Sequence, residues 1–562
     1  MGLNFFYTII LFVSLCCQSF GQIGDPKNDP LSKPSIFDPI IYSGIDSLFL
    51  KGELNFGLTG AGQKLTVWEA ELNGYPKLNN PLIDGKWLAG DSQAGFSEHA
   101  NSLAELLFSN INSKGFQGIA PQSQAVFFNT DNFWQEFAEN CPQINLSLHP
   151  YALNPGWQNF NAKNGKLFWS GLEEVSKKED YNFGFYSHET RLWDSILCEN
   201  PFHLAIKSAG NSRGEQGEGL HFFYRSKNNS TSDYFLDSSS TTRQKDGADM
   251  GYDCLPAVSV SKNLLVIGAL KMGKEAQNLK KEFIPQKDSP FGPTDDGRIK
   301  PDLMAFGEKT SQSAAFVAGA TLLVNEQYLE VFKEPASAFM LKCILIHTAD
   351  ELGKYKGPDY KMGWGLINAN KAVKLVSQPG RNLIQGNLKN GDSLRYFVRF
   401  KKGKNCKVTL VWNDPQGSPL EFRNDPNMLN STKSMLVNDL DLKITELVSG
   451  CSLLPFVLNP LRPDLPAKNG VNSLDNVESL IWELPYEGWY EIEIRHKGEL
   501  KGGSQDFALA ISNLEYGFAF DGKNWFPHKP NELEHHYPIL ILKGGKNLEK
   551  KEIEKFQNVS FE

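Results

Sequence analysis

A serine at the start of an alanine-rich helix is the residue of this sequence best placed to do chemistry. Positions 289–319 read SPFGPTDDGRIKPDLMAFGEKTSQSAAFVAG, a loop with turns set by Gly and Pro, followed by a helical pattern. Ser311 lies at the mouth of that predicted helix, where its hydroxyl can be exposed and the positive helix end faces whatever it attacks. The pattern predicts a nucleophile, and an N-cap serine is the structural alternative. Ser313, inside the first turn, is the poorer candidate.

The same stretch resembles the nucleophile region of the subtilases, the subtilisin-like serine peptidases. Their usual form is S-x-x-G-P-T-x-D-G-R-x-K-P-D followed by G-T-S-M-A-x-P, and the first half matches almost letter for letter. ILIHTADELGKYKGPDYKMGWGLINANKAV, YNFGFYSHETRLWDSIL and YDCLPAVSVSKNLLVIGA resemble further subtilase segments, the last two those of large exported bacterial members. The resemblance extends from about Leu48 to Asn513. It implies hydrolysis of peptide bonds by a serine, a base, an orienting acid and an oxyanion donor.

The resemblance also assigns the other three groups. Glu69 ends the predicted strand LTVWEA, where subtilases carry the Asp that orients the base. His99 begins HANSLAE at the position of the base, and Asn211 in SAGNS matches the oxyanion donor, with the Ser311 backbone N–H as second donor. We therefore expect His99 to take the Ser311 proton while Glu69 orients His99. The structural alternatives are a strand-end Glu, a surface His and a turn Asn.

Several positions depart from the subtilase pattern. Glu69 replaces Asp, Ser102 replaces a second His, Lys309 replaces Gly, and Ala315 replaces Pro; the segment between AFG and TS is almost absent. In INLSLHPY, His149 occupies a Gly position and is expected to crowd the substrate cleft. The retained Ser, His and Asn favour an endopeptidase with reduced activity. The departures favour a pseudopeptidase, a catalytically inactive subtilase scaffold that serves in binding. A third alternative is a protein that binds carbohydrate or a surface through the second domain, and only scattered Trp residues support it.

The spacing of apolar residues along the chain predicts the helices and strands that must position these residues. From about Gly52 to Gln378, the strand-like runs LTVWEA, AVFFN, FHLAIKSAG and LLVIGA alternate with helical patterns such as HANSLAELLFSNI. This alternation predicts an α/β domain, a subtilisin-like parallel sheet with helices on both faces.

The sequence pattern changes at about Arg381, where helical patterns give way to short strand-like runs. CKVTLVW, DLDLKITEL, YEIEIRH and DFALAIS alternate with turns, and Tyr490, Ile492 and Ile494 share one face of their strand. Period-two strands without intervening helices predict an antiparallel, jelly-roll-like β-sandwich. The predicted organisation is a signal peptide at 1–21, an N-terminal lead at 22–48, the peptidase domain at 49–378, the β-sandwich at 379–514 and an unassigned C-terminal tail at 515–562.

Acidic residues in the second domain suggest a metal. VNDLDL, GVNSLDNVES and GSQDFALAIS resemble signatures of the C-terminal domain of the large exported subtilases, which often binds calcium. We therefore expect a structural Ca²⁺ held by carboxylates near turns, namely Asp439, Asp441, Asp475 and Glu478. Solvated or capping carboxylates are the alternative.

The charge and the cysteine positions limit which partners, metal sites and disulfides can be expected. The 562 residues carry a formal net charge of −8, and there is no long basic run, which argues against nucleic acid as the main partner. A protein or peptide substrate is expected, and the oligomeric state is left open. None of the cysteines has metal-ligand spacing. Cys343, in an apolar run, is expected to be a buried thiol, whereas Cys406 and Cys451 form the pair to test for a disulfide.

The N-terminal residues predict export. An apolar core from Phe5 to Leu15 is short for a membrane span and is followed by small residues suited to cleavage before Gln22. No Lys or Arg precedes that core, so an uncleaved anchor remains the alternative; a lipoprotein cysteine at 16 or 17 fits less well after Leu15. No other run is long and apolar enough to span a bilayer. The expected location is secreted, cell-surface or periplasmic.

Overall fold

The structure is a computed structural model of the chain. It describes residues 42–49, 56–69, 74–91, 95–110, 117–152, 155–158, 167–217, 220–227, 231–237, 243–272, 283–378, 382–400, 403, 405–419, 429–483, 487–520, 525–526 and 540–543. The predicted signal peptide lies outside the described residues, as does most of the predicted lead.

A parallel sheet forms the centre of the N-terminal domain. Its eight strands follow the order β13-β12-β9-β6-β1-β5-β3, with β14 beside β12, and every pairing is parallel except β12 with β13. The strands are β1 (Lys64–Trp68), β3 (Trp87–Ala89), β5 (Gln124–Phe128), β6 (Leu146–His149), β9 (Leu204–Ser208), β12 (Leu265–Met272), β13 (Phe283–Pro285) and β14 (Leu303–Phe306). Central strands are buried on both faces, which explains their nearly continuous apolar sequences. The predicted α/β architecture is confirmed.

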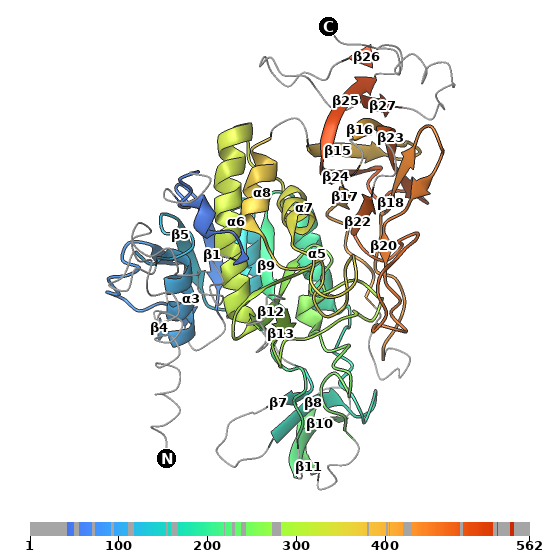
Figure 1. Ribbon diagram of the computed structural model, residues 1–562. Coiled ribbons are helices and arrows are strands. Elements are labelled where there is room, and N and C mark those ends of the chain that lie inside the picture. Colours follow the sequence, from blue (N-terminus) through green and yellow to red (C-terminus); the bar gives the residue numbers. More distant parts are fainter. Residues whose placement is uncertain are drawn as a thin grey trace, which may run out of the picture.

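Helices cover both faces of this sheet (Figure 1). The long α6 contacts β6, β9, β12 and β14 and packs beside α3 and α8, whereas α4 and α5 share an apolar cluster with residues of the opposite face. Gly319 permits the close approach of α6, because a Cβ there would lie 2.8 Å from the Cβ of Ile119. The helices are η1 (Asp46–Leu48), α3 (Glu98–Phe108), α4 (Phe133–Asn140), α5 (His188–Glu199), η2 (Ala257–Ser259), α6 (Thr310–Phe332), α7 (Ala338–Thr348) and α8 (Ala369–Val376).

A small separate sheet interrupts this alternation and was not predicted. Its order is β11-β10-β8-β7, and its strands are β7 (Trp157–Gln158), β8 (Leu167–Leu172), β10 (His221–Lys227) and β11 (Thr231–Asp237). It lies at the lower end of the molecule in Figure 1, where Trp157 and Trp169 pack together with Phe223. Two short strands, β2 (Gly74–Tyr75) and β4 (Gly95–Phe96), pair with each other near α3.

Apart from the two-stranded pair of β20 and β21, the C-terminal part contains two mainly antiparallel sheets, as predicted, in which the pairing of β25 with β27 is parallel. One has the order β15-β24-β17-β22 and the other β19-β18-β23-β16-β27-β25-β26, with an apolar cluster between them that includes Tyr490, Ile492 and Ile494. The strands are β15 (Leu383–Lys389), β16 (Leu394–Phe400), β17 (Asn405–Val411), β18 (Asp439–Glu446), β19 (Ser452–Leu453), β20 (Phe456–Val457), β21 (Lys468–Asn469), β22 (Val477–Glu483), β23 (Gly488–Lys497), β24 (Ser504–Ile511), β25 (Leu514–Phe520), β26 (Trp525–Phe526) and β27 (Leu540–Lys543). The last three lie largely in the segment that the sequence left unassigned.

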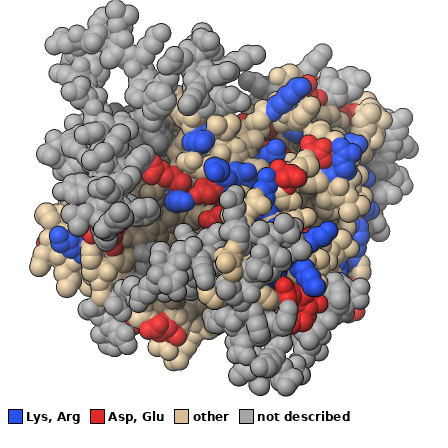
Figure 2. Space-filling model, turned by 90° about the horizontal axis from the view of Figure 1, so that it is seen from below, with Lys and Arg blue, Asp and Glu red and all other residues tan. Residues whose placement is uncertain are grey.

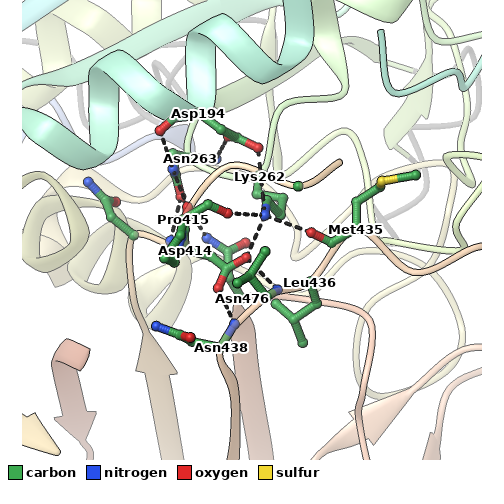
Figure 3. Close-up of polar contacts among 12 residues, drawn as sticks. Asp194, Lys262, Asn263, Asp414, Pro415, Met435, Leu436, Asn438 and Asn476 are labelled. Atoms are coloured by element: carbon green, nitrogen blue, oxygen red, sulfur yellow. Dashed lines mark hydrogen bonds and ion pairs between the residues drawn. The ribbon is translucent and has the colours of Figure 1, made fainter. Parts of the chain in front are cut away.

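A buried polar cluster joins the two parts of the chain (Figure 3). The ammonium of Lys262 donates to Asp414 Oδ2 at 2.5 Å and to the carbonyl oxygens of Pro415 and Met435. Asn263 donates from Nδ2 to the Asp414 carbonyl oxygen at 2.9 Å and accepts the Asp414 N–H at 2.9 Å. Lys262 and Asp414 are fully buried, so this cluster lies inside the contact between the two parts of the chain.

The cysteines do not pair in the described part of the chain. Cys343 is buried, as predicted. The suggested disulfide between Cys406 and Cys451 is wrong, because Cys406 is a buried free thiol inside the sandwich and Cys451 is an exposed free thiol. The alternation of apolar and polar residues in the sequence does not show that the Cys406 side chain is buried and the Cys451 side chain is exposed.

Two further observations concern the surface. Among the described helices, none is long and apolar enough to cross a lipid bilayer. On the described part of the face in Figure 2, basic and acidic side chains lie side by side rather than in fields of one sign.

Candidate active site

Three elements bring their ends together at the carboxyl edge of the parallel sheet. Glu69 directly follows β1, and its N–H donates to the carbonyl oxygen of Phe128 at the end of β5. His99 is the second residue of α3, whose N-terminus is capped by Ser97 through a 3.1 Å bond from the Ala100 N–H. Ser311 is the second residue of α6, as the sequence predicted. This is the edge at which open α/β sheets bind their ligands.

The three side chains form a continuous series of contacts. Glu69 Oε2 lies 2.6 Å from His99 Nδ1, and His99 Nε2 lies 2.9 Å from Ser311 Oγ. The Glu69 side chain is 1% exposed and the His99 side chain is 29% exposed, so the acid is shielded while the imidazole reaches solvent. The longer Glu therefore still reaches the imidazole. A carboxylate, an imidazole and a hydroxyl in this order can convert the hydroxyl to a nucleophile.

The candidate oxyanion donors lie next to Ser311. Asn211 lies in the turn after β9, directly after Gly210. Gly210 has a φ of +111°, which glycine adopts without steric cost. The Asn211 side-chain oxygen accepts the Thr310 N–H at 3.0 Å, which fixes the orientation of the amide. The Ser311 N–H belongs to the first turn of α6, where backbone donors have no acceptor within the helix. The amide nitrogen of Asn211 and this N–H are thus the two donors that the sequence proposed.

Thr310 is a positioning residue that the sequence reasoning did not single out. Its Oγ1 lies 2.9 Å from the Gly210 carbonyl oxygen and 3.1 Å from Asn211 Oδ1, and it accepts the Gly210 N–H at 3.2 Å. Thr310 is fully buried, so these contacts tie the α6 terminus to the turn after β9. Its place directly before Ser311 in the motif is the signal that could have identified it.

The departures from the subtilase pattern are accommodated locally. Lys309 has φ −130° and ψ 156°, an extended conformation open to any residue, and its side chain pairs with Asp288. Ser102 donates to the His99 carbonyl oxygen at 2.8 Å, and Ala315 is buried within α6. Ser313 is also buried, with its Oγ donating to the Ala305 carbonyl oxygen at 3.1 Å, so it faces the core.

The expectation that His149 crowds the cleft is wrong. His149 ends β6, which lies between β1 and β9, and its side chain is fully buried. The ring stacks on Trp68 at a centroid distance of 5.1 Å, and Nε2 lies 2.8 Å from Ser147 Oγ. Burial, followed by the charge of Lys207, holds the pKa of His149 well below its usual value. The imidazole belongs to the aromatic core beneath α4 and α5.

The four residues predicted to bind calcium do not form a metal site as they stand. The Lys497 ammonium lies 3.1 Å from Asp439 Oδ2 and 2.9 Å from Asp441 Oδ1. Glu478 accepts the Leu442 N–H, and burial raises its pKa well above the usual value. Asp475 accepts the Ile299 N–H at 2.9 Å, and burial raises its pKa to about 7. Lys497 thus pairs with two of the four carboxylates, whereas Asp439 Oδ1 and Asp441 Oδ2 are buried without a hydrogen-bond partner among the described residues, and calcium binding by this set stays a prediction.

Two cavities have lining residues that do not include Glu69, His99, Asn211 or Ser311. One, of about 450 Å³, lies among Phe133, Trp134, Tyr151, Trp193 and Lys207, at the carboxyl ends of neighbouring strands. The other, of about 560 Å³, is lined by residues that include Arg213 and Glu308, close in sequence to Asn211 and Ser311. Burial lowers the pKa of Lys207 to about 7.

Known proteins are similar to parts of this chain. The Dictyostelium discoideum serine protease/ABC transporter B family protein tagA is 28% identical and covers 30% of the chain, which spans 12% of the length of that relative. The serine protease of Aeromonas sobria is 13% identical, with 81% of this chain and 89% of that one aligned at a TM-score of 0.36. The prenylagaramide maturation protease PagA is 16% identical, with 56% of this chain and 93% of that one aligned at a TM-score of 0.35.

The family model gives the assignment. The model of the subtilase family, Peptidase S8, matches residues 84–365, about half of the chain. That span contains His99, Asn211 and Ser311, and Glu69 precedes it. With the parallel sheet and the three converging side chains in place, the match identifies this chain as a member of the subtilase family of serine peptidases.

Proposed function

We propose that the protein is a serine endopeptidase that hydrolyses peptide bonds in proteins or peptides outside the cytoplasm. The observation that supports this most directly is the unbroken series from Glu69 through His99 to Ser311, with separations of 2.6 and 2.9 Å. The family supplies serine-type peptide hydrolysis as the reaction class. Export rests on the apolar N-terminal run, and N-terminal sequencing of the exported protein would check cleavage before Gln22.

The proposed reaction follows from these positions. His99 Nε2 takes the proton of Ser311 as Oγ attacks the scissile carbonyl carbon, and the buried Glu69 carboxylate stabilises the imidazolium that forms. The carbonyl oxygen becomes an oxyanion, to which Asn211 Nδ2 and the Ser311 N–H donate; one such donor contributes about 10²–10³ in kcat. His99 then gives its proton to the leaving amine, and water completes hydrolysis of the acyl-enzyme.

A fluorophosphonate probe tests the proposal on the purified mature protein. We expect covalent labelling of the wild type and none of Ser311→Ala or His99→Ala, because labelling requires both the nucleophile and its base. Ser313→Ala is the matched control, since Ser313 faces the core two positions away, and it should label like the wild type. A folded wild-type protein that does not label would instead favour the pseudopeptidase alternative.

A structural calcium ion remains part of the proposal for this family member. Asp439 and Asp441 also pair with Lys497, so a calcium ion bound at these carboxylates would displace that ammonium.

A further inference from the structure

The smaller cavity, of about 450 Å³, has a buried cation in its wall. Lys207 is the fourth residue of β9 and is 1% exposed, whereas other lining residues, among them Asp131 and Glu189, are exposed at the rim. Lys207 shares a strand face with Ala205 and Ala209, which pack in the apolar cluster of α4 and α5. The ammonium therefore lies below the surface, beside a space that opens to solvent.

Two of the three donors of this ammonium have no acceptor in the described part of the chain. An ammonium carries three N–H groups, and that of Lys207 donates to the carbonyl oxygen of Tyr151 alone. It also lies 4.6 Å from the centre of the Tyr151 ring, a cation–π contact. Among the described residues, no carboxylate forms an ion pair with Lys207, although the charge of Glu189 acts on it. Because buried charges are normally paired, the ammonium is suited to a bound acceptor.

The other walls of the cavity are largely aromatic. Phe133 and Trp134 of α4 contact Trp193 of α5 at centroid distances of 5.2 and 5.6 Å. The Tyr151 ring lies 6.4 Å from that of Phe133. Charges attract each other more strongly among such apolar rings than in water. Burial lowers the pKa of Lys207 to about 7, so a bound anion would also restore its positive charge.

The cavity lies close to the candidate active site. Its lining includes residues that follow β5 and β6, and β1, which ends directly before Glu69, lies between these two strands. The charge of Glu69 acts on Tyr151 in the cavity wall. Lys207 precedes Asn211 by four residues, so their Cα atoms are at most about 14 Å apart. A substrate side chain in the cavity would therefore belong to a residue within about four positions of the scissile bond.

We propose that Lys207 selects substrates that have an acidic side chain, Glu or Asp, near the scissile bond. This inference rests on the proposed peptidase function and specifies its substrate class. The two oxygens of a carboxylate match the two remaining N–H groups of the ammonium, and its negative charge supplies the ion pair that Lys207 does not form among the described residues. Asp131 and Glu189 at the rim would repel a run of acids, so we expect selection of a single acidic residue.

Digestion of a peptide library tests the proposal. Peptides from a digested proteome are incubated with the purified mature protein, and the new cleavage sites are read by mass spectrometry. We expect Glu and Asp to be enriched at one position within about four residues of the cleaved bond. Lys207→Met that still reacts with the fluorophosphonate probe should cleave without this enrichment.

Lys407→Met is the matched control for this substitution. The Lys407 ammonium also donates to a carbonyl oxygen, that of Ile346 at 3.2 Å, but Lys407 belongs to β17 of the second domain. The variant should therefore keep the acidic enrichment of the wild type. Loss of the enrichment in both lysine variants would contradict a direct role of Lys207.

A pair of peptides measures the selectivity without any variant. The two share a sequence cleaved in the library and differ only in Glu or Gln at the enriched position, an exchange that keeps the shape and removes the charge. The wild type should cleave the Glu peptide with a kcat/KM about 10–100-fold higher, because a hydrogen bond to a charged group has that effect. Lys207→Met should cleave the two peptides equally.

The possible outcomes separate this inference from the proposed function. A wild type that labels and cleaves without an acidic preference, or a preference that persists in Lys207→Met, would overturn the role of Lys207 and leave the peptidase function intact. Cleavage at a fixed distance from peptide C-termini would overturn the side-chain assignment in favour of a terminal carboxylate. A folded wild type that neither labels nor cleaves would overturn the proposed function and this inference with it. If Lys207→Met does not fold, equal cleavage of the Glu and Gln peptides by the wild type would still refute the proposal.

Discussion

At the scale of single residues, the site depends on whether a glutamate can replace an aspartate. The extra methylene of Glu69 could have displaced the imidazole, yet Oε2 lies 2.6 Å from Nδ1 with the acid buried. Thr310 contributes at the same scale, because its hydroxyl and N–H fix the amide of Asn211. Departures such as Lys309 matter less, since an extended backbone does not require glycine.

Substitution of Glu69 tests its orienting role. Glu69→Gln should lower kcat/KM by about 10⁴, because the loss of the acid's charge and tautomer control has that effect in a well-studied triad. Glu69→Asp keeps the charge but shortens the reach, so we expect a smaller loss. Steady-state kinetics on a peptide that the wild type cleaves would measure both. Equal activity of Glu69→Gln and wild type would show that Glu69 does not orient His99.

At the scale of elements, two helix N-termini determine where the base and the nucleophile lie. The α3 terminus, capped by Ser97, presents His99, and the α6 terminus presents Ser311. The residues that position the site are therefore those that hold these two termini. Gly319 belongs to this set, because it allows α6 to lie close to Ile119 and Leu107, a residue of α3.

Removal of the α3 cap should affect both stability and catalysis. Ser97→Ala removes the acceptor of the Ala100 N–H, which should cost about 1 kcal/mol of unfolding free energy and lower kcat/KM by loosening the turn that carries His99. Ser97→Thr should restore both. Ser337→Ala removes the equivalent cap of α7, away from the candidate active-site residues, and should lower stability alone. Urea unfolding and kinetics would separate the two effects; unchanged kcat/KM in Ser97→Ala would contradict the argument.

At the scale of the whole molecule, the β-sandwich is joined to the peptidase domain through buried charge. Lys262 and Asp414 have no exposed side-chain surface, and their pair is surrounded by amide and carbonyl groups of both domains (Figure 3). Burial raises the pKa of Asp414, which the attraction of Lys262 opposes. The sandwich is thus expected to unfold together with the peptidase domain rather than behave as a separable appendage.

Breaking this pair from one side should be costly. Lys262→Met leaves Asp414 charged and buried, so we expect a loss of about 3–5 kcal/mol in unfolding free energy and faster proteolytic separation of the domains. Arg462→Ala removes the exposed pair with Asp464 and should leave the free energy of unfolding close to that of the wild type, because solvent screens this pair. Urea denaturation with limited proteolysis would measure the difference. Similar stability of the two variants would show that the domains do not depend on Lys262.

The sequence alone determined the features that are encoded locally. Short apolar runs predicted β1, β5, β9 and β12, helical spacing predicted α3, and period-two alternation predicted β17, β18, β23 and β24, because side-chain period reflects local backbone geometry. Motif spacing predicted the place of Ser311 at a helix terminus and of Asn211 in the turn after β9. These are properties of short stretches, in which each residue constrains its immediate neighbours.

Only the tertiary structure decided what depends on contacts between distant residues. His99 and Ser311 are 212 positions apart, and their 2.9 Å separation follows from the packing of α3 beside α6. The sequence does not show that β6 is covered on both faces, so the burial of His149 could not be predicted from it. The different environments of Cys406 and Cys451 could not be predicted either. Such convergence depends on packing, which no local pattern encodes.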